Sequence, residues 1–157
     1  MEKAEKTNAM RILEQKGEKY TPHYLRKIPS DGKEAAEMLG RDPSTVFKTL
    51  VTVGSDLGHY VFAIPVRETL DLKKAAKAVG VKAVEMLPQK ELFHLTGYVH
   101  GGCSPIGMKK VFPTVFDETA ILCDEIVTSA GKLGVFLSAA PVSFERAVGI
   151  QYADLVR

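Results

Sequence analysis

Residues 46–53 carry the clearest hydrophobic pattern in the chain. Their sequence is VFKTLVTV, in which six of the eight residues are β-branched or aromatic, and Gly54 follows directly. A strand period of two places Val46, Lys48 and Leu50 on one face and the alternate residues on the other. Both faces are largely apolar. The pattern therefore predicts a strand that is covered on both sides.

Lys48 interrupts one of these apolar faces. A buried ammonium group is costly unless it is paired, so a lysine at such a position has two common explanations. Its charge can extend to solvent or to a carboxylate, or it can bind an anionic ligand in a cleft. The pattern alone leaves both explanations open.

The rest of the chain predicts short helices and strands in an irregular order. Some strands follow each other as hairpins and others follow helices, which predicts an α+β fold: a mixed, largely antiparallel sheet, curled into a barrel-like core with helices outside. No internal repeat or linker divides residues 1–157, so we expect a single domain. Capping residues, prolines and glycines place helices at 7–16, 31–39, 71–79, 88–95 and 141–149, and apolar runs place further strands at 20–25, 60–64, 81–87, 111–115, 120–127 and 133–138.

Composition and charge narrow the class of protein. The chain is 45% hydrophobic and 25% charged, with a net charge of +2, so no strong overall field identifies a partner. Cys103 and Cys123 form no CxxC motif, which suits a reducing compartment. The charged N-terminus lacks a signal-peptide pattern, and no apolar run is long enough for a membrane helix. These features predict a cytoplasmic protein without a membrane partner.

Residues 96–107 form a second unusual stretch, with four glycines in twelve residues. Such a stretch allows the backbone to approach a ligand closely, or it is simply a tight connecting loop. Gly102 and Gly107 resemble a phosphate-binding loop, but Lys109 falls one place late and no Ser or Thr follows it. The pattern therefore excludes an NTPase of that type. A third glycine-containing stretch, residues 129–134, predicts a hairpin turn.

His100 and Cys103 raise two further alternatives, a cysteine nucleophile and, together with His94, a zinc site. No orienting third group accompanies the first pair, and no fourth ligand is spaced to complete the second set. The sequence therefore predicts neither a metal nor a cofactor.

Four motifs, in this order, resemble the YbaK/EbsC family of Cys-tRNA(Pro) deacylases. They are VFKTL at 46–50, LDLKKAA at 70–76, TGY at 96–98 with GGCSPIG at 101–107, and SAG at 129–131. The resemblance covers nearly the whole chain. It implies a barrel-like mixed sheet with surrounding helices, related to the editing domain inserted in bacterial prolyl-tRNA synthetases.

The resemblance also implies an activity. Members of the family release amino acids wrongly attached to tRNA. In this branch the thiol of the attached cysteine attacks its own ester carbonyl, and the cysteine leaves as a thiolactone. The implied substrate is Cys-tRNA(Pro), with Cys-tRNA(Cys) as a second candidate. The implied partners are the acceptor end of an aminoacyl-tRNA and prolyl-tRNA synthetase. Two alternatives stay open: a deacylase for another mischarged tRNA such as Ala-tRNA(Pro), and a non-catalytic module that binds tRNA or a synthetase.

Site residues follow from the same motifs. The functional lysine of the family falls on Lys48, where it would neutralise a phosphate or stabilise developing negative charge. Cys103 stands where the family often has an aliphatic residue, and Phe136 where a polar or acidic residue is expected, which leaves the amino-acid preference open. The implied substrate-binding residues are Tyr20 (or Tyr24 in its place), Thr49, Gly101, Gly102, Ser104, Pro105, Ser129 and Gly131.

Overall fold

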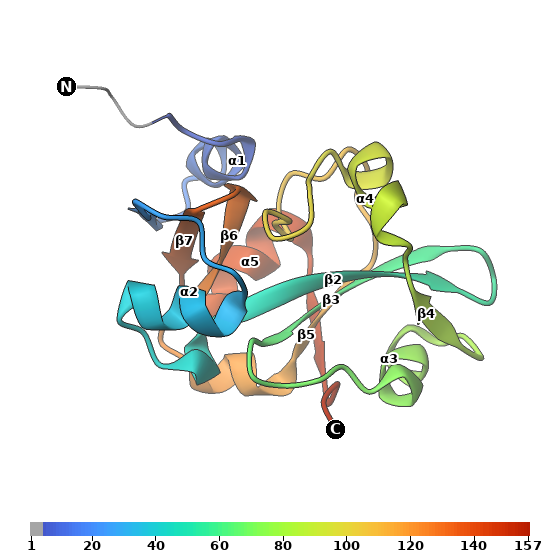
Figure 1. The fold of residues 1–157 in the computed structure, drawn as a ribbon. Helices are drawn as coiled ribbons and strands as arrows, with labels where there is room; N and C mark the ends of the chain where they lie inside the picture. Colours follow the sequence, from blue (N-terminus) through green and yellow to red (C-terminus); the bar gives the residue numbers. More distant parts are fainter. Residues whose placement is uncertain (1–4) are drawn as a thin grey trace.

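The computed structural model describes residues 5–157 and contains two β-sheets (Figure 1). The smaller sheet has the order β1-β7-β6, with both pairs antiparallel. The larger sheet has the order β4-β2-β3-β5-β8; β4, β2 and β3 pair antiparallel, whereas β5 pairs in parallel with β3 and β8. The strands are β1 (Thr21–Tyr24), β2 (Phe47–Gly54), β3 (His59–Pro65), β4 (Val84–Met86), β5 (Thr114–Asp117), β6 (Ile126–Lys132), β7 (Val135–Ala139) and β8 (Gln151–Ala153).

The mixed α+β class is as predicted, but the sheets do not close into a barrel. Within residues 5–157, one isolated parallel bridge between Val46 and Val127 connects the two sheets. The structure therefore has two separate sheets that meet near the start of β2, in place of the predicted barrel-like core.

Within residues 5–157, five short helices surround the sheets at the places that the sequence predicts. They begin and end at the expected residues because the local chemistry is strong: Asp31 accepts a hydrogen bond from the Glu34 N–H over 2.8 Å, and Gly40 ends the same helix in the left-handed conformation. None of the described helices is long and apolar enough to cross a bilayer. The helices are α1 (Asn8–Gln15), α2 (Gly32–Leu39), α3 (Leu72–Val79), α4 (Gln89–Thr96) and α5 (Pro141–Val148), with 3-10 turns at Pro43–Thr45 and Glu118–Leu122.

The predicted strand at 120–127 is wrong except for its last two residues, where β6 begins. Residues Glu118–Leu122 form a 3-10 turn, because the Asp117 carboxylate accepts hydrogen bonds from both the N–H and the hydroxyl of Thr119. The strand predicted at 111–115 is shifted and lies at Thr114–Asp117. The strand predicted at 81–87 is shortened to Val84–Met86. Strand β8 has no counterpart in the prediction.

Strand β2 is the centre of the apolar core. Val46, directly before β2, and Phe47, Leu50 and Val51 within it each pack into a different one of the four clusters of apolar side chains. The prediction that this strand is covered on both sides is therefore confirmed. Because every cluster contacts β2 or the residue directly before it, this segment fixes the relative positions of the surrounding elements.

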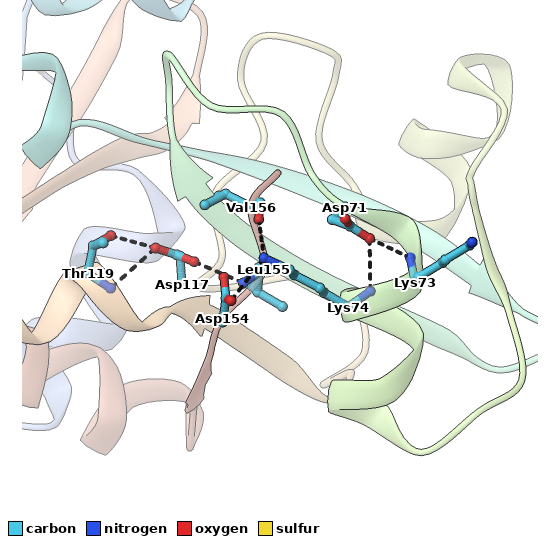
Figure 2. Close-up of polar contacts among 8 residues, drawn as sticks. All are labelled: Asp71, Lys73, Lys74, Asp117, Thr119, Asp154, Leu155 and Val156. Atoms are coloured by element: carbon cyan, nitrogen blue, oxygen red, sulfur yellow. Dashed lines mark hydrogen bonds and ion pairs between the residues drawn. The ribbon is translucent and has the colours of Figure 1, made fainter.

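A group of polar residues fastens the C-terminal segment to the larger sheet and α3; we call it the C-terminal network (Figure 2). Lys74 Nζ donates to Asp154 Oδ2 over 2.9 Å and to the Val156 carbonyl over 2.7 Å. Asp117, which is 1% exposed, accepts the Leu155 N–H over 3.0 Å. The network consists of Asp71, Lys73, Lys74, Asp117, Thr119, Asp154, Leu155 and Val156.

Candidate functional site

A pocket of about 520 Å³ lies over the first half of β2. Residues 46–50 form its floor, and residues 29–33 at the start of α2 form one wall. Figure 1 shows α2, the 96–107 loop and the β6–β7 hairpin around this part of β2. The remaining lining comes from Ala35, Val66, Leu92, His100, Gly101, Cys103, Ser129, Leu133 and Phe136.

Lys48 is a half-buried cation on the pocket floor. No ion pair or hydrogen bond from another described residue holds its Nζ. Burial lowers the pKa of Lys48, and the nearby positive charge of Lys33 lowers it further, while Glu68 and Asp31 act in the opposite direction. Its charge is therefore available to an anionic ligand.

Thr49 provides a second unused polar group. It lines the pocket, and in the described part of the chain its Oγ1 is the one buried side-chain nitrogen or oxygen without a hydrogen-bond partner. A buried hydroxyl without a partner costs about 1–3 kcal/mol. Because this oxygen has almost no accessible surface, Thr49 lines the pocket without offering its hydroxyl to a ligand in this structure.

The glycine-rich loop is held rigidly rather than left open. The Tyr98 hydroxyl donates to the Ile106 carbonyl over 2.6 Å, and Ser104 Oγ accepts from the Ile106 N–H over 3.1 Å. A Cβ at Gly102 would lie 3.1 Å from the backbone nitrogen of Leu133, so this glycine lets the loop pack on the β6–β7 hairpin. Of the predicted loop residues, Gly101 lines the pocket, whereas Gly102, Ser104 and Pro105 lie buried behind it.

The hairpin wall has a comparable arrangement. Ser129 lines the pocket, and its Oγ accepts the Gly131 N–H over 3.2 Å at an irregularity between Ser129 and Lys132. Gly131 has a φ of +100°, and a Cβ there would lie 2.7 Å from the Tyr98 ring. Gly131 therefore shapes the wall without lining the pocket.

The two candidate tyrosines lie outside the pocket lining. The Tyr20 hydroxyl donates to Glu14 over 2.8 Å, and the Tyr24 hydroxyl donates to the Glu5 carbonyl over 2.9 Å. The structure thus brings Lys48, Thr49, Gly101 and Ser129 together and leaves Tyr20 apart.

Neither alternative chemistry gains support from the geometry. Cys103 is 7% exposed, and burial raises its pKa to about 12, so the thiol is neutral at pH 7 and is a poor nucleophile. Across residues 5–157, no three His, Cys, Asp or Glu side chains converge as metal ligands, so His94, His100 and Cys103 do not form a zinc site.

Lys33 is a charged residue of the pocket lining that the sequence motifs do not include. Asp31 correctly predicts where α2 begins, but no local pattern shows that the first turn of this helix faces β2. That placement depends on tertiary packing, in which Ala35 and Ala36 join the apolar cluster around Val46.

The fold and pocket agree with comparisons to known proteins. Residues 30–147 match the profile of the aminoacyl-tRNA editing domain. The chain belongs to this family. It is 45% identical to EbsC of Enterococcus faecalis over 96% of this chain and 93% of that protein, whose name provisionally describes a Cys-tRNA(Pro)/Cys-tRNA(Cys) deacylase. The family resemblance of the four sequence motifs is thereby confirmed.

Two further similar proteins have descriptions that refer to prolyl-tRNA synthetase or are themselves a proline–tRNA ligase. A crystal structure described provisionally as a trans-editing enzyme for prolyl-tRNA synthetase superposes with a TM-score of 0.84 at 29% identity, over 96% of this chain and 95% of that one. The proline–tRNA ligase of Shouchella clausii is 32% identical over 64% of this chain, which corresponds to 18% of that enzyme. The first of these confirms the fold class.

Proposed function

We propose that residues 1–157 act as one editing domain that removes cysteine from Cys-tRNA(Pro) and Cys-tRNA(Cys) in trans. The similarity to EbsC over nearly the full length of both proteins supports the substrate class. The observation that carries the proposal is the pocket itself, whose floor carries the half-buried Lys48. Because the substrate is a tRNA, we place the activity in the cytoplasm.

The pocket is suited to the aminoacylated end of a tRNA. Its volume of about 520 Å³ lies within the range of roughly 300–1,000 Å³ that is typical of sites for small ligands. An aminoacyl-adenosine has a flat apolar base, a polar ribose and a short amino acid. The lining offers matching surfaces, since it contains Phe136 and Leu133 as well as Lys48 and Ser129.

The proposed chemistry takes its nucleophile from the substrate. The cysteinyl sulfur attacks the carbonyl carbon of its own ester, a C–S bond forms, and the bond from this carbon to the ribose oxygen breaks. The thiol proton ends on the ribose hydroxyl, and cysteine leaves as a thiolactone that water then opens. Holding the thiol beside its carbonyl supplies a large effective molarity, so the protein needs no nucleophile of its own.

Lys48 would act on this reaction. Negative charge develops on the carbonyl oxygen as the sulfur attacks, and the ammonium of Lys48 would stabilise it in a partly desolvated site. Thr49 would form part of the substrate-binding floor beside Lys48. The ion pairs formed by residues 5–157 do not include Lys48, so its charge is available for this role.

Selectivity would come from chemistry more than from fit. The lining near Phe136 is apolar and contains Val46 and Val66, and the carboxylate of the described lining, Asp31, already accepts a hydrogen bond from the first turn of α2. One methylene changes affinity by only about 1–3 kcal/mol, so shape discriminates weakly between small amino acids. A thiol at the β-carbon, in contrast, is required for cyclisation.

Prolyl-tRNA synthetase is the proposed partner. The proline–tRNA ligase of Shouchella clausii contains a segment similar to this chain, and the chain also resembles the structure described as a trans-editing enzyme for that synthetase. A partner that charges tRNA(Pro) with the wrong amino acid would deliver the substrate directly.

The test is deacylation of Cys-tRNA(Pro), Cys-tRNA(Cys) and Ala-tRNA(Pro) by the wild type and by Lys48→Ala. We expect loss of cysteine from both tRNAs, dependent on Lys48, and no loss of alanine. Loss of alanine at a comparable rate would replace thiol-assisted chemistry with a broader deacylase. If all three esters decay as in buffer, the chain is a binding module and the proposal fails.

A further inference from the structure

Lys33 is a second cation at the pocket, and it takes no part in the proposed reaction. It stands in the first turn of α2, is exposed, and lines the pocket whose floor carries Lys48. Its positive charge is close enough to lower the pKa of Lys48. Two like charges at one pocket repel each other, so the arrangement is unfavourable without a ligand.

Within residues 5–157, neighbouring carboxylates form no ion pair with the two lysines. Asp31 accepts the Glu34 N–H over 2.8 Å, and Glu34 in turn accepts from the N–H and hydroxyl of Ser30. Glu68 and Asp31 influence Lys48 only through space, and the ion pairs formed by residues 5–157 include neither Lys33 nor Lys48. Without an ion-pair partner in the described part of the chain, both ammonium groups can turn toward an anionic ligand, and two lysines against Asp31 leave the pocket lining with an excess of positive charge that favours one.

The two lysines differ in exposure, and this difference separates their roles. Lys48 is half-buried on the floor, where a charge that develops only in the transition state would be stabilised most. Lys33 is exposed, which suits an anion that stays partly hydrated and is charged before and after the reaction. In an aminoacyl-tRNA these two groups are the ester carbonyl and the phosphate on the 5′ side of the terminal adenosine.

We infer that Lys33 binds this terminal phosphate, while Lys48 faces the ester. The inference rests on the proposed function. It means that the two lysines together recognise the terminal nucleotide, one at its phosphate and the other at its ester. Substrates with a 5′-phosphate on the aminoacylated adenosine would bind more tightly than substrates without it.

The kinetic test compares 3′-cysteinyl-adenosine with 3′-cysteinyl-AMP. We expect the 5′-phosphate to raise kcat/KM of the wild type by about 10-fold, through KM, and Lys33→Gln to remove this advantage without changing kcat. Lys77→Gln, which removes an exposed lysine of α3 outside the pocket, should keep the advantage. An unchanged ratio in Lys33→Gln, or an equal loss for both substrates, would overturn the inference.

A binding test separates this inference from the proposed function. We expect AMP to bind the wild type about 10-fold more tightly than adenosine does, and equally weakly in Lys33→Gln, when followed by NMR titration. This result would stand even if no ester were cleaved. Equal affinities in the wild type would overturn the subsite. Binding of inorganic phosphate through Lys33 with no added affinity from adenosine would also overturn it, because the site would then bind free phosphate.

Discussion

Lys74 and Lys48 are two lysines of one chain in opposite electrostatic surroundings. Lys74 lies in the C-terminal network, where it donates to Asp154 and to the Val156 carbonyl, and the hydrogen bond to Asp154 raises its pKa. Lys48 lies on the pocket floor without such partners, and burial lowers its pKa. The fold itself supplies the hydrogen-bond partners of Lys74, whereas the ammonium group of Lys48 is available to a ligand.

The comparison shows how this chain separates stability from function. The C-terminal network, with its paired charges and hydrogen bonds (Figure 2), stabilises the native state, and none of its residues lines the pocket. A half-buried ammonium and an unpartnered hydroxyl destabilise it, yet both line the pocket. Such local violations of good packing are characteristic of functional sites.

The largest expected effect comes from Lys48→Met, which removes the charge but keeps the apolar stem. We expect kcat/KM for Cys-tRNA(Pro) to fall by about 100–1,000-fold, as when one group that stabilises a developing oxyanion is lost. Stability should rise by on the order of 1 kcal/mol, because a poorly solvated charge is gone. Deacylation assays and urea unfolding measure the two effects. Retained activity would remove Lys48 from the reaction.

Asp117→Ala should have the opposite profile. The buried carboxylate accepts from the N–H groups of Leu155 and Thr119, so its loss leaves buried donors unpaired and should cost about 2–3 kcal/mol of stability. Deacylation by the folded protein should stay within about twofold of the wild type, because the network does not touch the pocket. Asp124→Ala, which removes an exposed carboxylate, is the matched control. Equal unfolding midpoints for both variants would contradict the assignment.

Tyr98→Phe tests the link between the loop and the pocket wall. Removing the hydroxyl leaves the Ile106 carbonyl without its 2.6 Å hydrogen bond and should cost about 1–2 kcal/mol of stability. We expect kcat/KM to fall about 5–10-fold, because the loop that carries Gly101 loses one of its supports. Tyr152→Phe removes a hydroxyl that donates to Glu145 at the surface and should change neither quantity appreciably. A stable variant with normal activity would show that the loop does not depend on this bond.

The elements that could be predicted from the sequence are those that local chemistry determines. Asp31 and Asp71 accept hydrogen bonds from the first turns of α2 and α3, and Gly40 and Gly80 end these helices in the left-handed conformation. Strand β2 was recognisable because its pattern of alternation is apolar on both faces. Lys48 and Thr49 were placed in the pocket by family motifs, and their lack of partners among the described residues agrees with that placement.

What could not be predicted depends on contacts between distant segments. Strand β8 forms because residues Gln151–Ala153 pair in parallel with β5. A pattern of only three residues is too short to predict this pairing. Lys33 reaches the pocket only because α2 packs on the cluster around Val46. Tyr20 was assigned by resemblance in a region where two tyrosines compete, and the packing of α1 and β1 directs both hydroxyls elsewhere.

The pH dependence of deacylation offers a finer test of the lysine pair. Because burial lowers the pKa of Lys48, its charge is lost at a pH below 10.5, so the rate should fall with rising pH before that value. The rising limb should follow ionisation of the substrate thiol, at about pH 8.5. In Lys33→Gln the falling limb should move to higher pH, since a like charge that lowers the pKa of Lys48 is gone. A limb that does not move would show that Lys33 is too distant to influence Lys48.

The smallest expected effect belongs to Cys103→Ala, and it decides whose thiol reacts. Burial raises the pKa of Cys103 to about 12, so fewer than about one molecule in 10,000 carries the thiolate at pH 7. We therefore expect deacylation of Cys-tRNA(Pro) within about twofold of the wild type, and iodoacetamide should not inactivate the protein. Cys123→Ala is the control, because that cysteine lies outside the pocket lining. If Cys103→Ala instead abolished cleavage, and replacing the substrate cysteine by serine did not, the nucleophile would belong to the protein and Lys48 would serve to activate it.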